Sequence, residues 1–102
     1  MEDPRTILSP AETASELDGS GFAHEDRLVG SFRTADFASS VRLLDAVAVE
    51  ADAADHHPDV HLGWGRISFE LSSHDVGGVT SRDVTLARRI RELADEQGAK
   101  PA

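Results

Sequence analysis

The stretch that decides the fold is residues 52–83, DAADHHPDVHLGWGRISFELSSHDVGGVTSRD. Pro58 sets the latest possible end of a preceding helix, because proline removes a helix hydrogen bond. Two runs follow in which apolar residues alternate with polar or small ones, and a Gly-Trp-Gly triplet separates them. Their apolar residues are Val60 and Leu62 in the first run and Ile67, Phe69 and Leu71 in the second. Alternation with period two predicts a hairpin of two strands.

A helix is expected directly after this hairpin. Two consecutive glycines break the alternation, and Thr80 then stands as a candidate N-cap with the acid Asp83 at position N3. Val79 and Val84 add the apolar pair that often staples a helix start. The expected buried residues are Leu86, Ile90 and Leu93, with Gly98 and Pro101 closing the helix.

Upstream of the decisive stretch, a short helix and a second hairpin are expected. Ser9 and Glu12 form a capping box with proline at the first helical position, so a helix should run to about Leu17. Residues 22–33 then change to an alternating pattern around a polar turn at residues 24–26. This pattern predicts two more strands.

Between the two hairpins the sequence predicts a long helix. Thr34 is its candidate N-cap, because a threonine hydroxyl can accept from a free N–H of the first turn. Apolar residues recur after it at intervals of four, three and four: Phe37, Val41, Leu44 and Ala48. This spacing predicts one apolar face that packs against the rest of the protein.

The order helix, two strands, helix, two strands, helix predicts the fold class. We expect an α+β domain of two layers, with a four-stranded antiparallel sheet covered on one face by helices. Residues 1–102 are expected to form a single domain, because a chain of 102 residues is too short for two hydrophobic cores. The other face of the sheet is then available for a partner or a substrate.

Composition excludes several classes of function. A formal net charge of −9 argues against binding to nucleic acid or to an anionic membrane, and partners are expected to be small molecules or proteins. The chain has no cysteine and no apolar segment long enough for a secretory or membrane-spanning signal, so a cytoplasmic location is expected. A domain this small often gains core by association, so we expect a homodimer or a homotetramer.

The candidate chemistry lies in the decisive stretch, which holds four of the five histidines. His56 and His57 are adjacent and cannot share one face of a helix or strand, so a loop fixed by Pro58 is their expected place. His74 follows the last strand of the hairpin and can converge on them. Three imidazoles around one cleft suit proton transfer near neutral pH. A dehydration needs little more, since it protonates a leaving hydroxyl and removes a neighbouring proton.

The spacing of these residues resembles the signature of the pterin-4a-carbinolamine dehydratases. The matching positions are Asp52, then His56, His57 and Pro58, then Trp64, His74 and Asp83. The segment Arg33–Phe37 also looks like the family's entry into its long helix, so the resemblance covers roughly residues 22–97.

The resemblance implies a reaction and a set of roles. The reaction is loss of water from a 4a-hydroxytetrahydropterin to give the quinonoid dihydropterin, in pterin recycling, without a metal or a bound cofactor. It makes His56 and His74 the acid/base pair, has His57 hold the pterin and its 4a-hydroxyl, and has Asp83 support the site. The substrate-binding residues it implies are His57, Pro58, Trp64 and Asp52.

Other interpretations of the same residues stay open. Asp83 can cap its helix without any catalytic duty, and both roles can hold at once. Trp64 is as consistent with the core as with the pocket. A metal site is also conceivable, because imidazole and carboxylate suit zinc or iron; its ligands would be His56, His61, His74, Asp55 and Asp59.

An alternative from another class is a protein-interaction module that uses the sheet edge or a helix face. The resemblance makes this credible, since some similar proteins also act as dimerisation partners of transcription factors. The intact histidine spacing favours the enzyme, because a binding module has no need of three convergent imidazoles.

Overall fold

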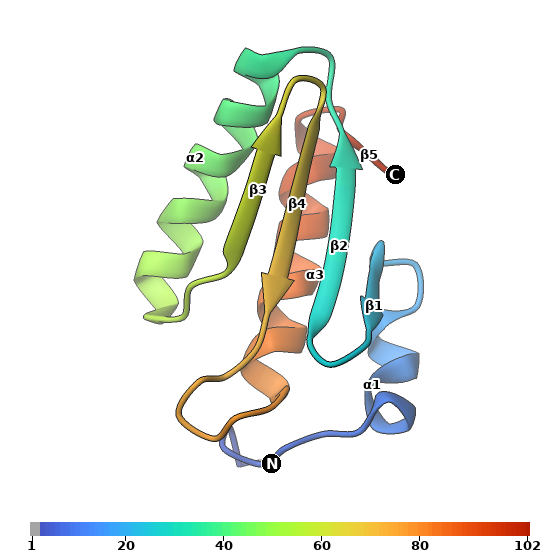
Figure 1. The fold of residues 1–102 in the computed structure, drawn as a ribbon, viewed down its shortest axis with the longest axis vertical. Helices are drawn as coiled ribbons and strands as arrows, with labels where there is room; N and C mark the ends of the chain where they lie inside the picture. The colour runs from blue at the N-terminus through green and yellow to red at the C-terminus, as the bar shows by residue number, and fades with distance from the viewer. Residues whose placement is uncertain (1–2) are drawn as a thin grey trace.

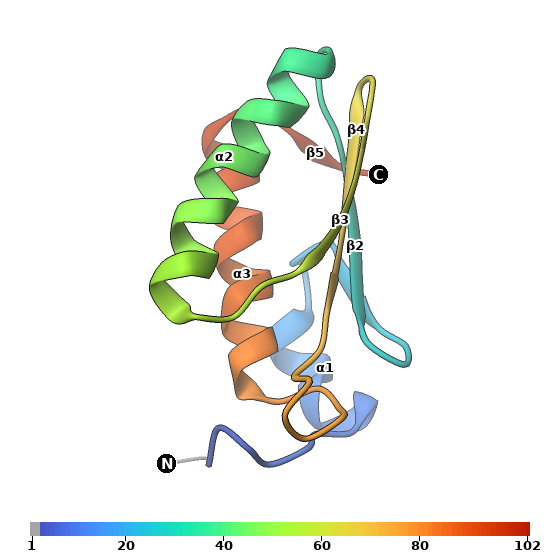
Figure 2. The same ribbon diagram turned by 60° about the vertical axis from the view of Figure 1, so that its left-hand side comes forward.

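The computed structural model describes residues 3–102 and places the helices on one face of an antiparallel sheet, as the element order predicts (Figures 1 and 2). The elements are α1 (Pro10–Leu17), β1 (Phe22–His24), β2 (Leu28–Arg33), α2 (Phe37–Ala54), β3 (Asp59–Gly63), β4 (Arg66–Leu71), α3 (Ser81–Glu96) and β5 (Lys100–Pro101). Within the described range, no helix is both long and apolar enough to cross a membrane.

The sheet has the order β1-β2-β4-β3, and each neighbouring pair is antiparallel. The sequence predicts these four strands but misses β5, which pairs with β2 through Phe32↔Pro101 and Arg33↔Lys100. Because β4 occupies one edge of β2, β1 and β5 share the other edge. A two-residue strand that contains proline has no alternating pattern to detect. Proline is tolerated at strand positions where its missing N–H is not needed for a hydrogen bond between strands.

Capping residues begin the helices, and two of the three predicted caps are confirmed. Complete capping boxes stand at the starts of α1 and α3. For α2 the prediction of Thr34 is wrong, because Asp36 is the N-cap and its carboxylate accepts from the Ser39 N–H at 2.8 Å. Thr34 instead exchanges a hydrogen bond with the Ser40 hydroxyl at 2.7 Å.

The buried face of α2 also differs from the prediction. The buried residues are Ser40, Leu43, Val47 and Ala51, whereas the predicted stripe of Phe37, Val41, Leu44 and Ala48 is at best partly covered. Phe37 in particular is 50% exposed. α2 carries two adjacent apolar stripes, and periodicity alone does not say which one meets the sheet. Ser40 in the buried stripe weakens the apolar pattern further, because a polar residue does not indicate burial. Its hydroxyl is satisfied there by a hydrogen bond to the Gly63 carbonyl at 3.2 Å.

The core fills the space between the sheet and the helices. Phe32 and Phe69 lie on neighbouring strands, are fully buried, and meet edge to face with ring centroids 6.2 Å apart. On the opposite sheet face, the hydroxyls of Ser31 and Ser68 hydrogen bond to each other at 2.7 Å. Core and surface therefore alternate along the central strands, as a one-sided sheet requires.

The register of β3 and β4 decides where the polar loops meet. Asp59 at the start of β3 pairs with Glu70 near the end of β4. The loop that enters β3 and the loop that leaves β4 therefore lie at the same end of the sheet, where α3 also begins (Figure 1). The histidines of the sequence signature lie on these two loops.

Candidate active site

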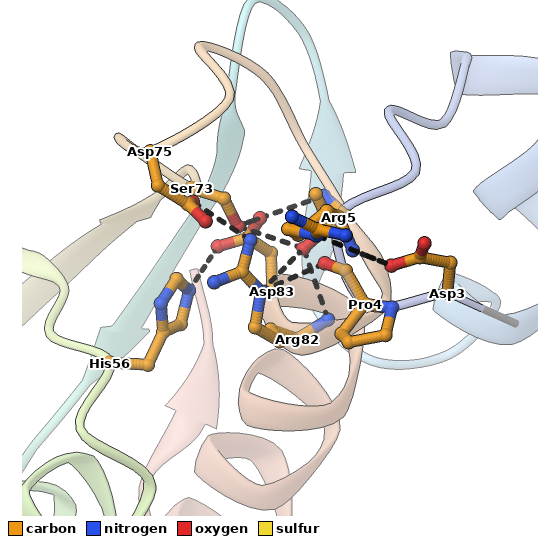
Figure 3. A network of polar contacts seen from close by, with 9 residues as sticks. Asp3, Pro4, Arg5, His56, Ser73, Asp75, Arg82 and Asp83 are labelled. Atoms are coloured by element: carbon orange, nitrogen blue, oxygen red, sulfur yellow. Dashed lines mark hydrogen bonds and ion pairs between the residues drawn. The ribbon is translucent and has the colours of Figure 1, made fainter.

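The Asp83 carboxylate lies at the centre of the polar cluster at this end of the sheet (Figure 3). Its side chain is fully buried in the first turn of α3. Oδ2 accepts from the Thr80 backbone N–H at 2.9 Å and from the Ser73 hydroxyl at 2.8 Å. Oδ1 lies 2.5 Å from His56 Nε2. Asp83 therefore caps α3 and at the same time binds a candidate catalytic histidine.

This contact determines the proton arrangement on His56. An ionised carboxylate only accepts hydrogen bonds, so His56 Nε2 carries the proton and donates it to Asp83. The other ring nitrogen, Nδ1, makes no hydrogen bond to residues 3–102. Every fully buried polar side-chain atom of these residues has a hydrogen-bond partner, so Nδ1 must be accessible to solvent. In the neutral ring Nδ1 is then the atom that can take up a proton.

The end of α2 places His56 beside α3. Asp55 adopts a left-handed conformation with φ of 49° as the C-cap of the helix. The next N–H, that of His56, still bonds back to the Ala51 carbonyl at 3.0 Å. This sharp end leaves the His56 side chain 10% exposed. The ring lines a groove of about 260 Å³ between α2 and α3, with walls that include Ala54 and Leu86.

His57 repeats the arrangement on a more exposed site. Its Nε2 lies 2.9 Å from Asp52 Oδ1, a carboxylate of the last turn of α2. The two side chains are 55% and 78% exposed. Because adjacent side chains diverge, His56 meets α3 while His57 meets α2. Each histidine is thus held by its own carboxylate through the same ring nitrogen.

His74 directly follows Ser73, which belongs to this cluster, and its own side chain is exposed. The neighbouring Ser73 donates to Asp83 and exchanges a second hydrogen bond with the Thr80 hydroxyl at 2.8 Å. The His74 ring itself makes no hydrogen bond to the described residues. The structure therefore places His74 one residue from the Asp83 contacts but does not lock its ring.

The remaining predicted site residues lie in different places. Pro58 is half-buried and directly precedes β3, between the histidines and the sheet. Trp64 is 76% exposed in the turn between β3 and β4, at the end of the hairpin away from His57. Within one chain the structure places Trp64 neither in the core nor with the histidines.

The alternative metal site is not assembled. Across residues 3–102 no three His, Cys, Asp or Glu side chains are grouped to hold a metal ion. His61 lies on β3 and lines the open outer face of the sheet. Asp59 also lies on that strand, where its carboxylate pairs with Arg27 at 3.6 Å. The outward alternation of β3 thus carries these two groups away from His56.

Sequence reasoning missed two contributors to the cluster, Ser73 and Arg82. Ser73 is 1% exposed, and a buried hydroxyl must find partners. Arg82 reaches across to Asp75 in the loop that carries His74. Each is directly adjacent in sequence to a residue of the signature, but the sequence gives no signal of which atoms it contacts.

The chain is similar in sequence to a known protein family. The model of the family described as "Pterin 4 alpha carbinolamine dehydratase" matches residues 6–93. A protein of Thermosynechococcus vestitus is 38% identical over 89 residues, covering 85% of this chain and 94% of the relative. One of Nocardia farcinica is 42% identical over 69 residues, covering 68% and 73%. Both carry the name "Putative pterin-4-alpha-carbinolamine dehydratase".

Two solved structures share the fold. One, described as a transcriptional coactivator/pterin dehydratase from Brucella melitensis, superposes with a TM-score of 0.81 at 26% identity, covering 87% of this chain and 99% of that one. The other is a pterin dehydratase-like protein identified as a RuBisCO assembly factor in the alpha-carboxysome. Its TM-score is 0.59 at 20% identity, covering 72% of this chain and 86% of that one, so it supports the fold alone.

The two capping boxes give a test of the role of Asp83. Asp83→Ala removes three hydrogen bonds from a buried site and should lower the free energy of unfolding by about 2 kcal/mol or more in urea titrations. Glu12→Ala removes the matching acid of the α1 box, which is exposed, and should cost much less. Equal losses in the two variants would show that Asp83 is only a helix cap.

Proposed function

The chain belongs to the pterin 4 alpha carbinolamine dehydratase family, and we propose that it removes water from a 4a-hydroxytetrahydropterin to give the quinonoid dihydropterin. The observation that carries the proposal is the contact between the buried Asp83 carboxylate and His56. It supplies a histidine with a defined proton-accepting atom at the position where the family signature expects an acid or base. The proposed pathway is pterin recycling.

The reaction needs two proton transfers and no change of oxidation state. The bond between C4a and the hydroxyl breaks, and the hydroxyl leaves as water after it receives a proton. The neighbouring N–H loses its proton, and the electron pair of that bond forms the new C=N bond. One histidine as base and one as acid complete the cycle, and positioned groups of this kind contribute roughly 10²–10⁴-fold each.

We assign the base and acid to His56 and His74 and leave His57 to hold the pterin and its 4a-hydroxyl. Asp83 keeps the His56 ring oriented, and its carboxylate lies beside the imidazolium that forms when His56 acts as a base. Asp52 does the same for His57 from an exposed position, where solvent weakens the effect. In this mechanism the protein's own side chains carry every proton, without a metal.

A second candidate function is a protein-interaction module on the same fold. The descriptions of the two similar structures, a coactivator and an assembly factor, favour it for those proteins. In this chain the observation that favours it is the partly uncovered apolar stripe of α2. This second function needs none of the histidine contacts.

The dehydration rate of a 4a-hydroxytetrahydropterin, followed by absorbance after exhaustive chelation, tests the proposal. We expect acceleration by the wild-type protein and a loss on the order of 10²-fold in both His56→Ala and His74→Ala. His61→Ala is the matched control, because that histidine lies on the outer sheet face. Its rate should match wild type.

Two results would contradict the dehydratase. The first is a folded wild-type protein that gives no acceleration, which would favour the interaction module. The second is turnover in both histidine variants that equals turnover in the control.

We further infer that the chain forms a homodimer or a homotetramer through the α2 stripe of Phe37, Val41, Leu44 and Ala48. Phe37 and Ala48 of this stripe are exposed and Val41 and Leu44 are half-buried, and apolar surface left open on a small domain can mark an interaction site. The stripe extends over 12 residues, or about 18 Å of helix, which is long enough for a helix pair.

Light scattering after gel filtration tests this association. Val41→Glu places a charge in the centre of the stripe and should reduce the mass to that of one chain, with the circular dichroism spectrum unchanged. Ala14→Glu, on an exposed position of α1, is the control. A monomeric wild-type protein, or a Val41→Glu variant that keeps its mass, would rule the stripe out.

A further inference from the structure

The loop between β4 and α3 carries His74 at its tip, and the backbone hydrogen bonds of this loop lie at its base. Ser73 and Gly78 form an isolated bridge, with the Ser73 N–H donating to the Gly78 carbonyl at 2.8 Å. The Gly77 N–H closes the turn on the Ser73 carbonyl at 2.9 Å. Residues 74–77 form the tip, and the His74 ring receives no support from the described residues.

One side chain ties this tip to the body of the protein. The Asp75 carboxylate accepts from Arg82 Nη2 at 2.8 Å, and Arg82 lies in the first turn of α3, directly before Asp83 (Figure 3). A charge-assisted bond of this length is among the stronger polar contacts of a surface. Asp75 is the residue after His74, so the bond acts on the catalytic candidate through one peptide unit.

Arg82 is itself braced from the other side. Its Nε donates to the Pro4 carbonyl at 2.9 Å, and the Thr80 hydroxyl lies 3.3 Å from the same nitrogen. These contacts leave the Arg82 side chain 31% exposed. Because Nε and Nη2 donate hydrogen bonds to different partners, the plane of the Arg82 guanidinium is fixed, unlike that of an arginine free in solvent.

The N-terminal segment completes the support. The Leu8 N–H donates to the Val79 carbonyl at 2.8 Å. The Ile7 side chain packs on Gly78 so closely that a Cβ there would lie 2.9 Å from Ile7 Cγ2. Residues 4–8 therefore run along the base of the loop and hold the carbonyl that orients Arg82.

The electrostatics agree with this geometry. The hydrogen bond from Arg82 lowers the pKa of Asp75 below its usual value, with a smaller contribution from the charge of Arg5. Asp75 is therefore ionised at neutral pH, and the contact is a full ion pair under the conditions of the proposed reaction.

We propose that Arg82 is a positioning residue for His74: its ion pair with Asp75, braced by the Pro4 carbonyl, holds the loop tip that carries His74, one residue from the Ser73–Asp83 contact. The inference rests on the proposed dehydratase function for its kinetic consequence, but the anchoring of the loop is independent of it.

The competing explanation is an ordinary surface ion pair without effect on the site, which is what most exposed pairs are. The chain offers a matched control for it on the same helix. Arg91 Nε donates to the Asp95 carboxylate at 2.9 Å, and its Nη1 donates to the Gly19 carbonyl at 2.7 Å. Arg91 thus joins one carboxylate to one backbone carbonyl, as Arg82 does, but far along α3 from the histidines.

The kinetic test compares Arg82→Gln, Asp75→Asn and Arg91→Gln. We expect about tenfold lower kcat in the first two with little change in KM, because small displacements of a catalytic group cost rate rather than binding. The double variant Asp75→Asn/Arg82→Gln should be no slower than Arg82→Gln, since both remove the same bond. Arg82→Lys keeps the charge but loses the fork, so an intermediate kcat is expected. Arg91→Gln should match wild type.

Hydrogen exchange of the same variants separates this proposal from the dehydratase itself. Arg82→Gln and Asp75→Asn should exchange the Val76 and Gly77 amides faster, with melting temperatures close to wild type, while Arg91→Gln leaves them unchanged. Unaltered exchange in Arg82→Gln would overturn the anchoring, whatever the enzyme does. Faster exchange with wild-type kcat would overturn the positioning role. An inactive wild-type protein would defeat the dehydratase, and exchange would still decide the anchoring.

Discussion

The buried carboxylate of Asp83 is the constraint on which this end of the molecule depends. Removing a charge from water costs several kcal/mol unless hydrogen bonds replace the lost solvation. Here the replacement comes from Thr80, Ser73 and His56, which belong to the N-cap of α3, to the loop after β4 and to the loop before β3. The three segments must therefore meet at one point. The same contacts that satisfy the carboxylate assemble the candidate site.

The rest of the fold can be understood as the frame for this meeting point. Antiparallel pairing of β3 with β4 brings the two loops to one end of the sheet, and the buried Phe32 and Phe69 lie in the core between the sheet and the helices. The outer sheet face and one stripe of α2 take no part in the cluster. A partner on either surface would therefore not contact Asp83 or His56.

Sequence patterns predicted the parts of the structure that depend on local rules. Both capping boxes and both hairpins follow from short-range signals, and the histidine signature contains His56 and Asp83, which the structure brings into contact. Two features depended on tertiary contacts instead. The buried stripe of α2 was selected by packing from two apolar candidates, and β5 forms by pairing with a strand far away in sequence. The hydrogen bonds of Ser73 and Arg82 could not be predicted from the sequence either, because they depend on which residues the fold brings together.

The Asp83 contact holds His56 with its proton on Nε2, and in the proposed dehydratase this leaves Nδ1 to exchange protons with the substrate. Long-range nitrogen–proton correlation spectra of histidine-labelled protein, at a pH where the ring is neutral, report this tautomer directly. We expect a His56 ring protonated at Nε2 in the wild-type protein and a loss of that preference in Asp83→Ala. A neutral His56 protonated at Nδ1 would contradict this, since Nε2 would then have no proton to donate to the Asp83 carboxylate.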